Sequence, residues 1–264
     1  GWLPAAQGLP YTIGFENAEG ASQYVSEVRI VTELDSDLNA RSLALGDMKI
    51  GEITIHVPGQ RSTFQGDFDL TGTRGFILRV SAGVDLFSNT ASWLLQAIDP
   101  LTGEVLQDPQ RGLLPPNDGL GSGAGFVSYQ VATADEIATG TEISAGARVL
   151  MNTLAPEDTA TLTHRVDGVP PASSIQVSRI SPETEDFRFE WQVTDDAGGS
   201  GFRHVTLYVA RDGGDFKIWQ RQLSESEGSL VYQGEVGHTY EFLALATDLA
   251  GNRERPVLGR NVAD

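Results

Sequence analysis

Residues 237–252 have the sequence GHTYEFLALATDLAGN, and this stretch decides the fold of the C-terminal third of the chain. From Tyr240 to Ala246 every second residue is apolar, which is the pattern of a strand with one buried face. Asp248, Gly251 and Asn252 follow directly, and residues of these types are typical of a tight turn. The stretch therefore predicts a strand that ends in a turn.

Alternating apolar residues recur in shorter runs earlier in this third of the chain. The first two runs lie at 187–193 and 205–209, on either side of the loop sequence DDAGGSG at 195–201. Asp212-Gly213-Gly214 is a hairpin signal, and two further runs follow near 216–219 and 230–232. The segment therefore predicts a succession of short antiparallel strands.

On these residues the C-terminal third resembles a fibronectin type III domain. Trp191 matches the tryptophan of the second strand of that family, and Tyr240 matches the tyrosine that opens the penultimate strand. Residues 246–252 match the strand end and turn that follow. The resemblance implies a β-sandwich with Trp191 in its core and the Tyr240 hydroxyl bonded to the backbone, and it implies little about function.

A wider resemblance covers most of the chain. Segments 194–201 and 246–252 are similar to immunoglobulin-like and fibronectin-like modules at the C-termini of very large secreted bacterial proteins, cyanobacterial ones among them. In those proteins such a module often follows a domain like the N-terminal part of this chain, which carries similar segments at 9–17, 34–38, 98–103, 114–117 and 125–129. The resemblance implies an extracellular or cell-surface location and no particular activity.

The N-terminal part is also patterned for strands. Period-two alternation recurs there between turn signals, and the best helical candidate, residues 38–45, predicts no more than a turn or two. Prolines and glycines between Asp99 and Gly125 predict a long ordered loop. Asp167-Gly168 followed by Pro170-Pro171 predicts a short, stiff linker. We therefore predict an all-β fold of two tandem β-sandwich domains. The first comprises residues 1–166 and contains the long loop near 99–125, and the second, residues 167–264, is fibronectin type III-like.

Composition excludes several classes of function. The formal net charge of −18 opposes binding to nucleic acid and to anionic membranes. We predict no membrane span, since no apolar run approaches the roughly 20 residues that a transmembrane helix needs. The absence of cysteine excludes disulfides, thiolate metal sites and a cysteine nucleophile. The acidity suits a hard cation such as Ca²⁺, and it equally suits a soluble, salt-tolerant surface.

Two acidic loops of the C-terminal domain predict a Ca²⁺ site. Asp195 and Asp196 lie between the second and third strands, and Asp248 and Asn252 lie before the last strand. These loops share one end of a fibronectin-like sandwich, so the four side chains are expected to converge on one cation. The alternative is that Asp248 and Asn252 only bond the backbone of their own turn.

Other polar residues predict no reaction centre. The pairs Asp35/Asp37 and Asp67/Asp69 each point to one side of an extended chain, as metal ligands or an acid and base would, but also as a solvated strand face or a turn cap would. His56, His164, His204 and His238 lack the paired spacing of a zinc protease, and neither a nucleophile elbow nor a phosphate loop is present. We therefore predict that the chain is not an enzyme.

Aromatic side chains offer an alternative, carbohydrate binding. The candidates are Trp2, Trp93, Trp219 and Tyr208. Trp93 alternates with apolar residues and is expected in the core, whereas Trp219 is out of phase with Phe216 and Ile218 and is expected to face outward.

An unpaired edge is expected near the N-terminus. Tyr11 begins what matches the second strand of a sandwich, and the preceding residues show little alternation, so a usual first strand is missing. An open edge invites strand addition from another chain, unless residues 1–7 or the linker cover it.

These patterns predict a non-catalytic extracellular structural or adhesive module, such as a surface-protein spacer or a fibre subunit. We expect Ca²⁺ to stiffen it, and β-strand addition to join it to other protein subunits or surface proteins, further copies of itself included. The alternative is an accessory carbohydrate-binding region of a secreted hydrolase, with a polysaccharide as its partner.

Overall fold

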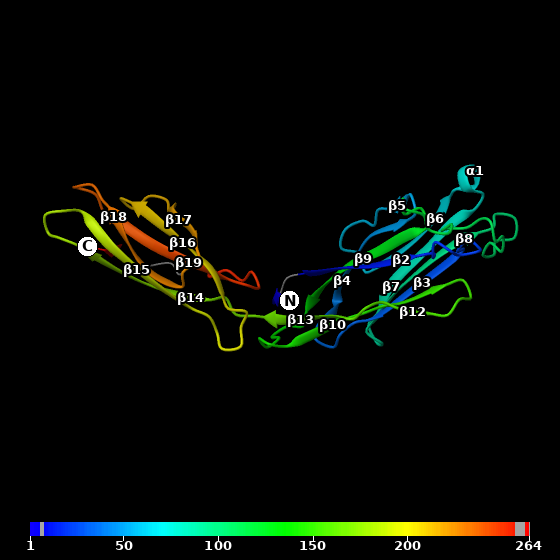
Figure 1. Ribbon diagram of the computed structural model, residues 1–264, viewed down its shortest axis with the longest axis horizontal. Helices are drawn as coiled ribbons and strands as arrows, with labels where there is room; N and C mark the ends of the chain where they lie inside the picture. Colours follow the sequence, from blue (N-terminus) through cyan, green and yellow to red (C-terminus); the bar gives the residue numbers. More distant parts are fainter. Residues whose placement is uncertain (6–7, 257–261, 264) are drawn as a thin grey trace. The chain divides into compact units, whose positions relative to one another are not determined.

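The computed structural model describes residues 1–5, 8–256 and 262–263, and its regular secondary structure consists almost entirely of strands, which turns and loops connect (Figure 1). The predicted all-β class is confirmed. One single-turn helix, α1 (Thr71–Arg74), is the exception within the described ranges. None of the helical structure in those ranges is long and apolar enough to span a membrane.

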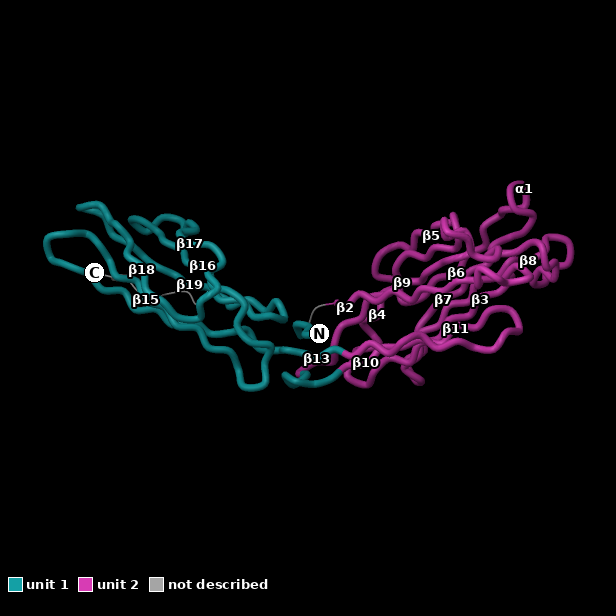
Figure 2. The backbone as a smooth tube through the Cα atoms, viewed as in Figure 1, with its two compact units in different colours: residues 1–5, 137–142, 164–264 teal, residues 6–136, 143–163 magenta. Residues whose placement is uncertain are grey.

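The chain divides into two compact units (Figure 2). Unit 1 comprises residues 1–5, 137–142 and 164–264, and unit 2 comprises residues 6–136 and 143–163. The predicted domain boundary at 166/167 stays a prediction. Each compact unit is built from more than one segment of the chain, so no single position in the sequence divides the two units.

Unit 1 contains a sandwich of two sheets. The first sheet has the order β14 (Ala172–Arg179), β15 (Asp186–Thr194), β18 (Glu227–Gln233). The second has the order β17 (Lys217–Leu223), β16 (Phe202–Arg211), β19 (Tyr240–Asp248), β20 (Val262–Ala263). The strand pairings within these two sheets are antiparallel. The predicted fibronectin type III-like sandwich is therefore present.

The two marker residues of this sandwich lie as the resemblance implies. Tyr240 is the first residue of β19, and its hydroxyl accepts a hydrogen bond from the Glu235 backbone N–H at 2.8 Å. Trp191 is buried on β15, and its Nε1 donates to the Glu225 carbonyl at 3.0 Å. Each of the two side chains is therefore buried, and its one polar atom forms a hydrogen bond.

Trp219 is the residue whose orientation the sequence predicted wrongly. Its ring packs inward in edge-to-face contact with Phe189, Tyr232 and Phe242, with centroid distances of 5.5, 5.3 and 6.0 Å. Phe216 and Ile218 are exposed instead. Trp219 is therefore out of phase with these two residues, as the sequence predicted, and the error was to take their face of the strand as the buried one.

Unit 2 is a second sandwich. One sheet has the order β2 (Gly8–Glu16), β9 (Ala124–Thr133), β4 (Leu38–Ile50), β5 (Ile53–Ile55). The other has the order β12 (Glu157–Asp158), β11 (Arg148–Met151), β3 (Glu27–Glu33), β8 (Thr90–Ile98), β7 (Ile77–Asp85), β6 (Thr63–Asp69). Trp93 on β8 is fully buried between them, as predicted.

A third, small sheet has the order β1 (Trp2–Pro4), β13 (Leu162–Asp167), β10 (Glu142–Ala145). β1 pairs with β13 in parallel, with Leu3 opposite Val166 and Pro4 opposite Asp167. This pairing fixes Asp167 at the end of β13, immediately before the chain enters the sandwich of unit 1.

The segment 38–45, expected to form at most a turn or two of helix, belongs to β4 instead. Its pairing with β9 shifts register between Asn39 and Ala44 and again between Leu45 and Met48. Such bulges place consecutive residues on one face, which imitates a short helical spacing in the sequence.

Candidate metal centre and unpaired strand edge

Three carboxylates of unit 1 converge at one end of its sandwich. Asp167 ends β13, and Asp195 and Asp196 begin the loop between β15 and β16. One carboxylate oxygen from each lies within 4.8 Å of the others. Three negative groups this close repel one another unless a cation or protons neutralise them.

Backbone amides satisfy only part of this group. The Ser200 N–H donates to Asp167 Oδ2 at 2.7 Å, and the Gly201 N–H donates to Asp195 Oδ2 at 2.6 Å. The Oδ1 atoms of Asp195 and Asp196 are buried without a hydrogen-bond partner among the described residues. Buried carboxylate oxygens with no donor are costly, so this pair of oxygens is available to a cation.

The electrostatics of Asp195 agree with that picture. Burial raises the pKa of its carboxyl group, and the charges of Asp167 and Asp196 raise it further, while the hydrogen bond from Gly201 acts in the opposite direction. Within the described ranges, none of the ion pairs to Lys, Arg or His involves these three aspartates. The described residues therefore supply no ion-pair partner to the cluster.

The loop backbone approaches the carboxylates closely at Gly199. A Cβ atom placed on this residue would lie 2.4 Å from Asp196 Oδ1 and 3.1 Å from Asp195 Oδ2. Any side chain at 199 would thus clash with these oxygens, so glycine allows the two carboxylates to lie as they do. Carboxylate oxygens in an adaptable loop are the donor set that Ca²⁺ prefers, so the residues present fit this ion.

Asp248 and Asn252, the other two predicted ligands, serve the turn after β19. Asp248 Oδ1 accepts hydrogen bonds from the backbone N–H groups of Gly251 at 2.7 Å and Asn252 at 2.8 Å. The Asn252 Nδ2 donates to Asp248 Oδ2 at 2.8 Å and to the Asp167 carbonyl at 2.9 Å. The structure therefore brings Asp195 and Asp196 together, adds Asp167, and gives the other two a positioning role.

Asp167 is the site residue that the sequence did not reveal. The sequence Asp167-Gly168 before two prolines is an ordinary turn signal, and nothing local connects it to the loop at Asp195. Only the end of β13, held by β1, places this carboxylate against the sandwich.

The acidic pairs of unit 2 serve as caps and as an ion-pair partner. Asp35 Oδ1 accepts from the Asp37 N–H at 3.1 Å, and Asp69 Oδ1 accepts from the Thr71 N–H at 2.9 Å. Asp67 forms a two-point ion pair with Arg79, which lowers the pKa of the aspartate. These contacts favour the turn-cap and strand-face interpretation over a metal or acid–base site.

The four histidines have different surroundings. His56 contacts Asp47 at 2.9 Å, and His238 contacts Asp212 at 2.7 Å. His164 and His204 each bury an Nδ1 without a partner among the described residues, and burial lowers the pKa of His204. No hydrogen bond in the described ranges joins two histidines.

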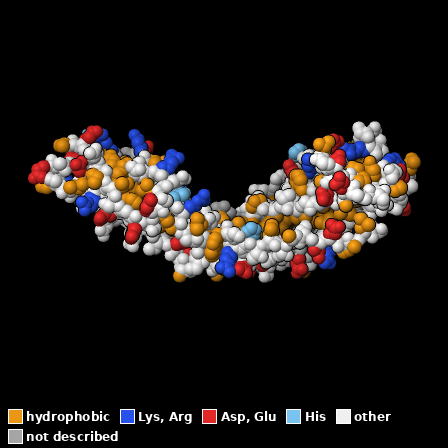
Figure 3. Space-filling view, viewed as in Figure 1, with side chains coloured by type: hydrophobic (Ala, Val, Ile, Leu, Met, Phe, Trp, Pro, Cys, Tyr) orange, Lys and Arg blue, Asp and Glu red, His pale blue; other side chains and the backbone are white. Residues whose placement is uncertain are grey.

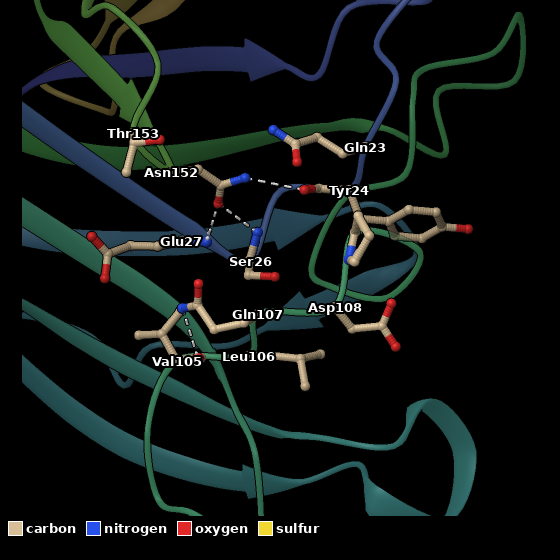
Figure 4. Close-up of a pocket in the computed structure, with 11 residues that line it drawn as sticks. Gln23, Tyr24, Ser26, Glu27, Val105, Leu106, Gln107, Asp108, Asn152 and Thr153 are labelled. Carbon is tan, nitrogen blue, oxygen red and sulfur yellow. Dashed lines mark hydrogen bonds between the residues drawn. The ribbon is translucent and has the colours of Figure 1, made fainter.

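A polar pocket of about 250 Å³ lies in unit 2 and is shown in Figure 4. Asn152 on its wall is fully engaged with the backbone: its Oδ1 accepts from the N–H groups of Ser26 at 2.8 Å and Glu27 at 3.1 Å, and its Nδ2 donates to the Tyr24 carbonyl at 3.1 Å. This residue thus fastens the chain around β3, and three of its hydrogen-bonding positions are taken by the backbone.

The two carboxylates that line this pocket are also engaged. Glu27 accepts a hydrogen bond from Gln96 at 2.6 Å. Asp108 accepts one from Arg111 at 2.8 Å, and this contact lowers the pKa of Asp108. A general acid needs a raised pKa, so Asp108 is unsuited to that role.

The predicted open edge is β2, the outermost strand of its sheet. Its nine residues pair with β9 without a register shift, and alternate residues are buried. No backbone hydrogen bond joins residues 9–15 to any described residue outside β9. A groove of about 270 Å³ runs beside residues 11–14 and is lined on its other side by residues 145–147 and by parts of 159–162.

Comparison with known proteins gives structural similarity only. No protein-family model and no curated protein matches the chain. It is similar to the collagen-binding domain of a Staphylococcus aureus adhesin, with 15% identity, 60% of this chain and 87% of that one covered, and a TM-score of 0.31. It is also similar to fibronectin(III)-like modules of Clostridium thermocellum CbhA, with 9% identity, coverage of 97% and 85%, and a TM-score of 0.36.

A further similar structure is the C-terminal domain of the Streptococcus agalactiae AgI/II polypeptide BspA, with 10% identity, coverage of 96% and 91%, and a TM-score of 0.41. TM-scores below 0.5 at such identities carry no argument about function, which therefore rests on the residues of this chain.

Proposed function

We propose that the chain is a non-catalytic structural or adhesive module of the extracellular surface, which Ca²⁺ stiffens and which joins other proteins by β-strand addition at β2. The observation that carries the proposal is the carboxylate cluster, in which two buried oxygens have neither a hydrogen-bond donor nor an ion-pair partner among the residues that the structure describes. Acidic side chains are spread over the visible face of both units in Figure 3, which suits a soluble surface.

Stiffening follows from where the three ligands sit. Asp167 belongs to the segment before the sandwich, whereas Asp195 and Asp196 belong to the loop after β15. A cation bound by all three would tie the end of β13 to that loop and restrain residues 168–171, which connect β13 to β14. Extracellular Ca²⁺ modules commonly bind with dissociation constants of about 0.1–1 mM, which is the range we expect.

The carbohydrate-binding alternative loses its best candidate, because Trp219 packs into the aromatic core.

The strand-addition part of the proposal rests on the free flank of β2 and the groove beside it. An extended segment placed there would gain main-chain hydrogen bonds along one flank of β2.

Calorimetric titration of the whole chain with CaCl₂ tests the cation, with MgCl₂ as the matched control. We expect Ca²⁺ to bind and Asp195→Ala to abolish the binding heat. Protease cleavage within 168–171 should slow with Ca²⁺ in the wild type and not in Asp195→Ala. If no heat is detected up to millimolar Ca²⁺ and cleavage does not change, the stiffening proposal is wrong.

A further inference from the structure

We infer that the partner added at the β2 edge is a second copy of this chain, paired antiparallel about a two-fold axis at Thr12. This inference rests on the strand-addition part of the proposed function and names its partner. It is carried by the residues of β2, by the groove beside that strand, and by the contrast with the other edges of unit 2.

The other outer strands of unit 2 carry features that discourage pairing. β12 consists of two exposed acidic residues, Glu157 and Asp158, and β5 is only three residues long. β6 exposes Asp67 and Asp69. Short edge strands and edge charges are the usual means by which proteins prevent unwanted strand addition.

β2 has little of this protection. It is nine residues long, and Glu16 at its end is the one charged residue in it. Its exposed positions are otherwise occupied by Gly8, Pro10, Thr12 and Gly14, all of them small. A Cβ atom at Gly14 would meet nothing within 4 Å, so the outer face is open there. Pro10 removes a single donor and leaves the rest of the strand able to pair.

The groove beside β2 has the same character. No charged residue lines it, although charged residues make up 20% of the chain. An acidic or basic partner segment would therefore find no opposite charge there. The occupant that matches is a strand with apolar residues on one face and little charge, and β2 of a second copy is such a strand, because residues 8–15 are uncharged.

Antiparallel self-pairing about Thr12 satisfies each position of β2. In that register Tyr11 lies opposite Ile13 and Leu9 lies opposite Phe15, so the buried faces of the two copies continue one another. Pro10 faces Gly14, and Glu16 faces Gly8. No like charges oppose each other, and closed two-fold pairing uses the same edge on both chains.

The net charge of each copy opposes this contact. Two chains of formal charge −18 repel at long range, and added salt screens that repulsion. Association through an uncharged edge should therefore strengthen as the salt concentration rises, which is the opposite of what an ion-paired interface would do.

Sedimentation equilibrium of the whole chain, with and without Ca²⁺ and at low and high NaCl, tests the inference. We expect a species of twice 28.3 kDa that becomes more populated with protein concentration and with salt. Thr12→Lys and Thr12→Glu should each be monomeric alone, because equal charges then meet on the axis. An equimolar mixture of the two should dimerise again. Ser92→Lys, an equally exposed substitution on the inner strand β8, should dimerise like the wild type.

Circular dichroism of each variant confirms that it is folded before its mass is interpreted. A wild type that stays monomeric throughout, a Thr12→Lys variant that dimerises alone, or a mixture that stays monomeric would each overturn the inference. Calcium calorimetry separates the two proposals: a monomer that binds Ca²⁺ overturns only the second-copy partner, and a dimer that binds none overturns only the cation.

Discussion

Replacing Asp196 with asparagine should change stability in opposite directions with and without Ca²⁺. The carboxylate of Asp196 has a buried oxygen with no donor in the described part of the chain, and it lies within 4.8 Å of two other carboxylates. Two unit charges at that separation repel by about 3.5 kcal/mol at an effective dielectric constant of 20. Partial exposure and salt reduce this repulsion to on the order of 1 kcal/mol. In a chelator, the variant should therefore be as stable as the wild type or more stable.

With Ca²⁺ the order should reverse. A ligand at 100 times its dissociation constant stabilises the folded state by about 2.7 kcal/mol. For a domain of about 100 residues this raises the melting temperature by on the order of 10 °C. Asp196→Asn keeps the shape of the side chain but loses one formal charge of the cluster, so most of this rise should disappear.

Differential scanning calorimetry in EDTA and in saturating CaCl₂ measures both effects on one preparation. Asp215→Asn removes the same charge from an exposed loop of the same unit and serves as the matched control. A purely structural role for Asp196 predicts that the variant is less stable in EDTA as well as in Ca²⁺. That result, or an equal rise with Ca²⁺ in both proteins, would refute the metal site.

Three further predictions concern the sandwich of unit 1. Tyr240→Phe leaves the Glu235 N–H without its acceptor and should cost about 1–2 kcal/mol in urea unfolding. Trp219→Ala should cost about 2–3 kcal/mol, since the ring is half-buried, whereas Ile218→Ala should stay within about 0.5 kcal/mol; equal losses would contradict the inward orientation of Trp219. The pKa of Asp195 is raised in the folded state, so stability in EDTA should fall as pH rises from about 4 through that pKa. The Ca²⁺-induced rise in melting temperature should grow over the same pH range. A Ca²⁺-induced rise that does not depend on pH would contradict this prediction.

The sandwich of unit 1 could be predicted from sequence because its markers act locally. Trp191 follows alternating apolar residues on one strand, and Tyr240 opens another, so both could be placed without knowing which strands pair. The structure confirms both the burial of Trp191 and the hydroxyl bond of Tyr240. Markers of this kind can be recognised in a sequence because each depends on a single strand and its own turn.

Alternation gives the phase of a strand but not which of its faces is buried. Trp219 is out of phase with Phe216 and Ile218 as counted, but those two residues are exposed, so the face taken as buried is the solvent face. Bulges hid the strand at residues 38–45, where two register shifts occur against β9. A bulge depends on the partner strand, and a single sequence does not show which strand that is.

The candidate site was half predictable for a similar reason. Asp195 and Asp196 stand in one loop, so their proximity needs no tertiary information, whereas Asp167 reaches them only because β13 ends against the sandwich. Asn252 connects the predicted residues to Asp167, because its amide nitrogen donates to both Asp248 Oδ2 and the Asp167 carbonyl. The turn at residues 248–252 therefore holds the backbone at Asp167, and cation binding by its own side chains stays a prediction. Asp248 and Asn252 were predicted as oxygen ligands, but Asp248 accepts hydrogen bonds from its own turn and Asn252 donates one to the Asp167 carbonyl. Such positioning roles become visible only in the three-dimensional contacts.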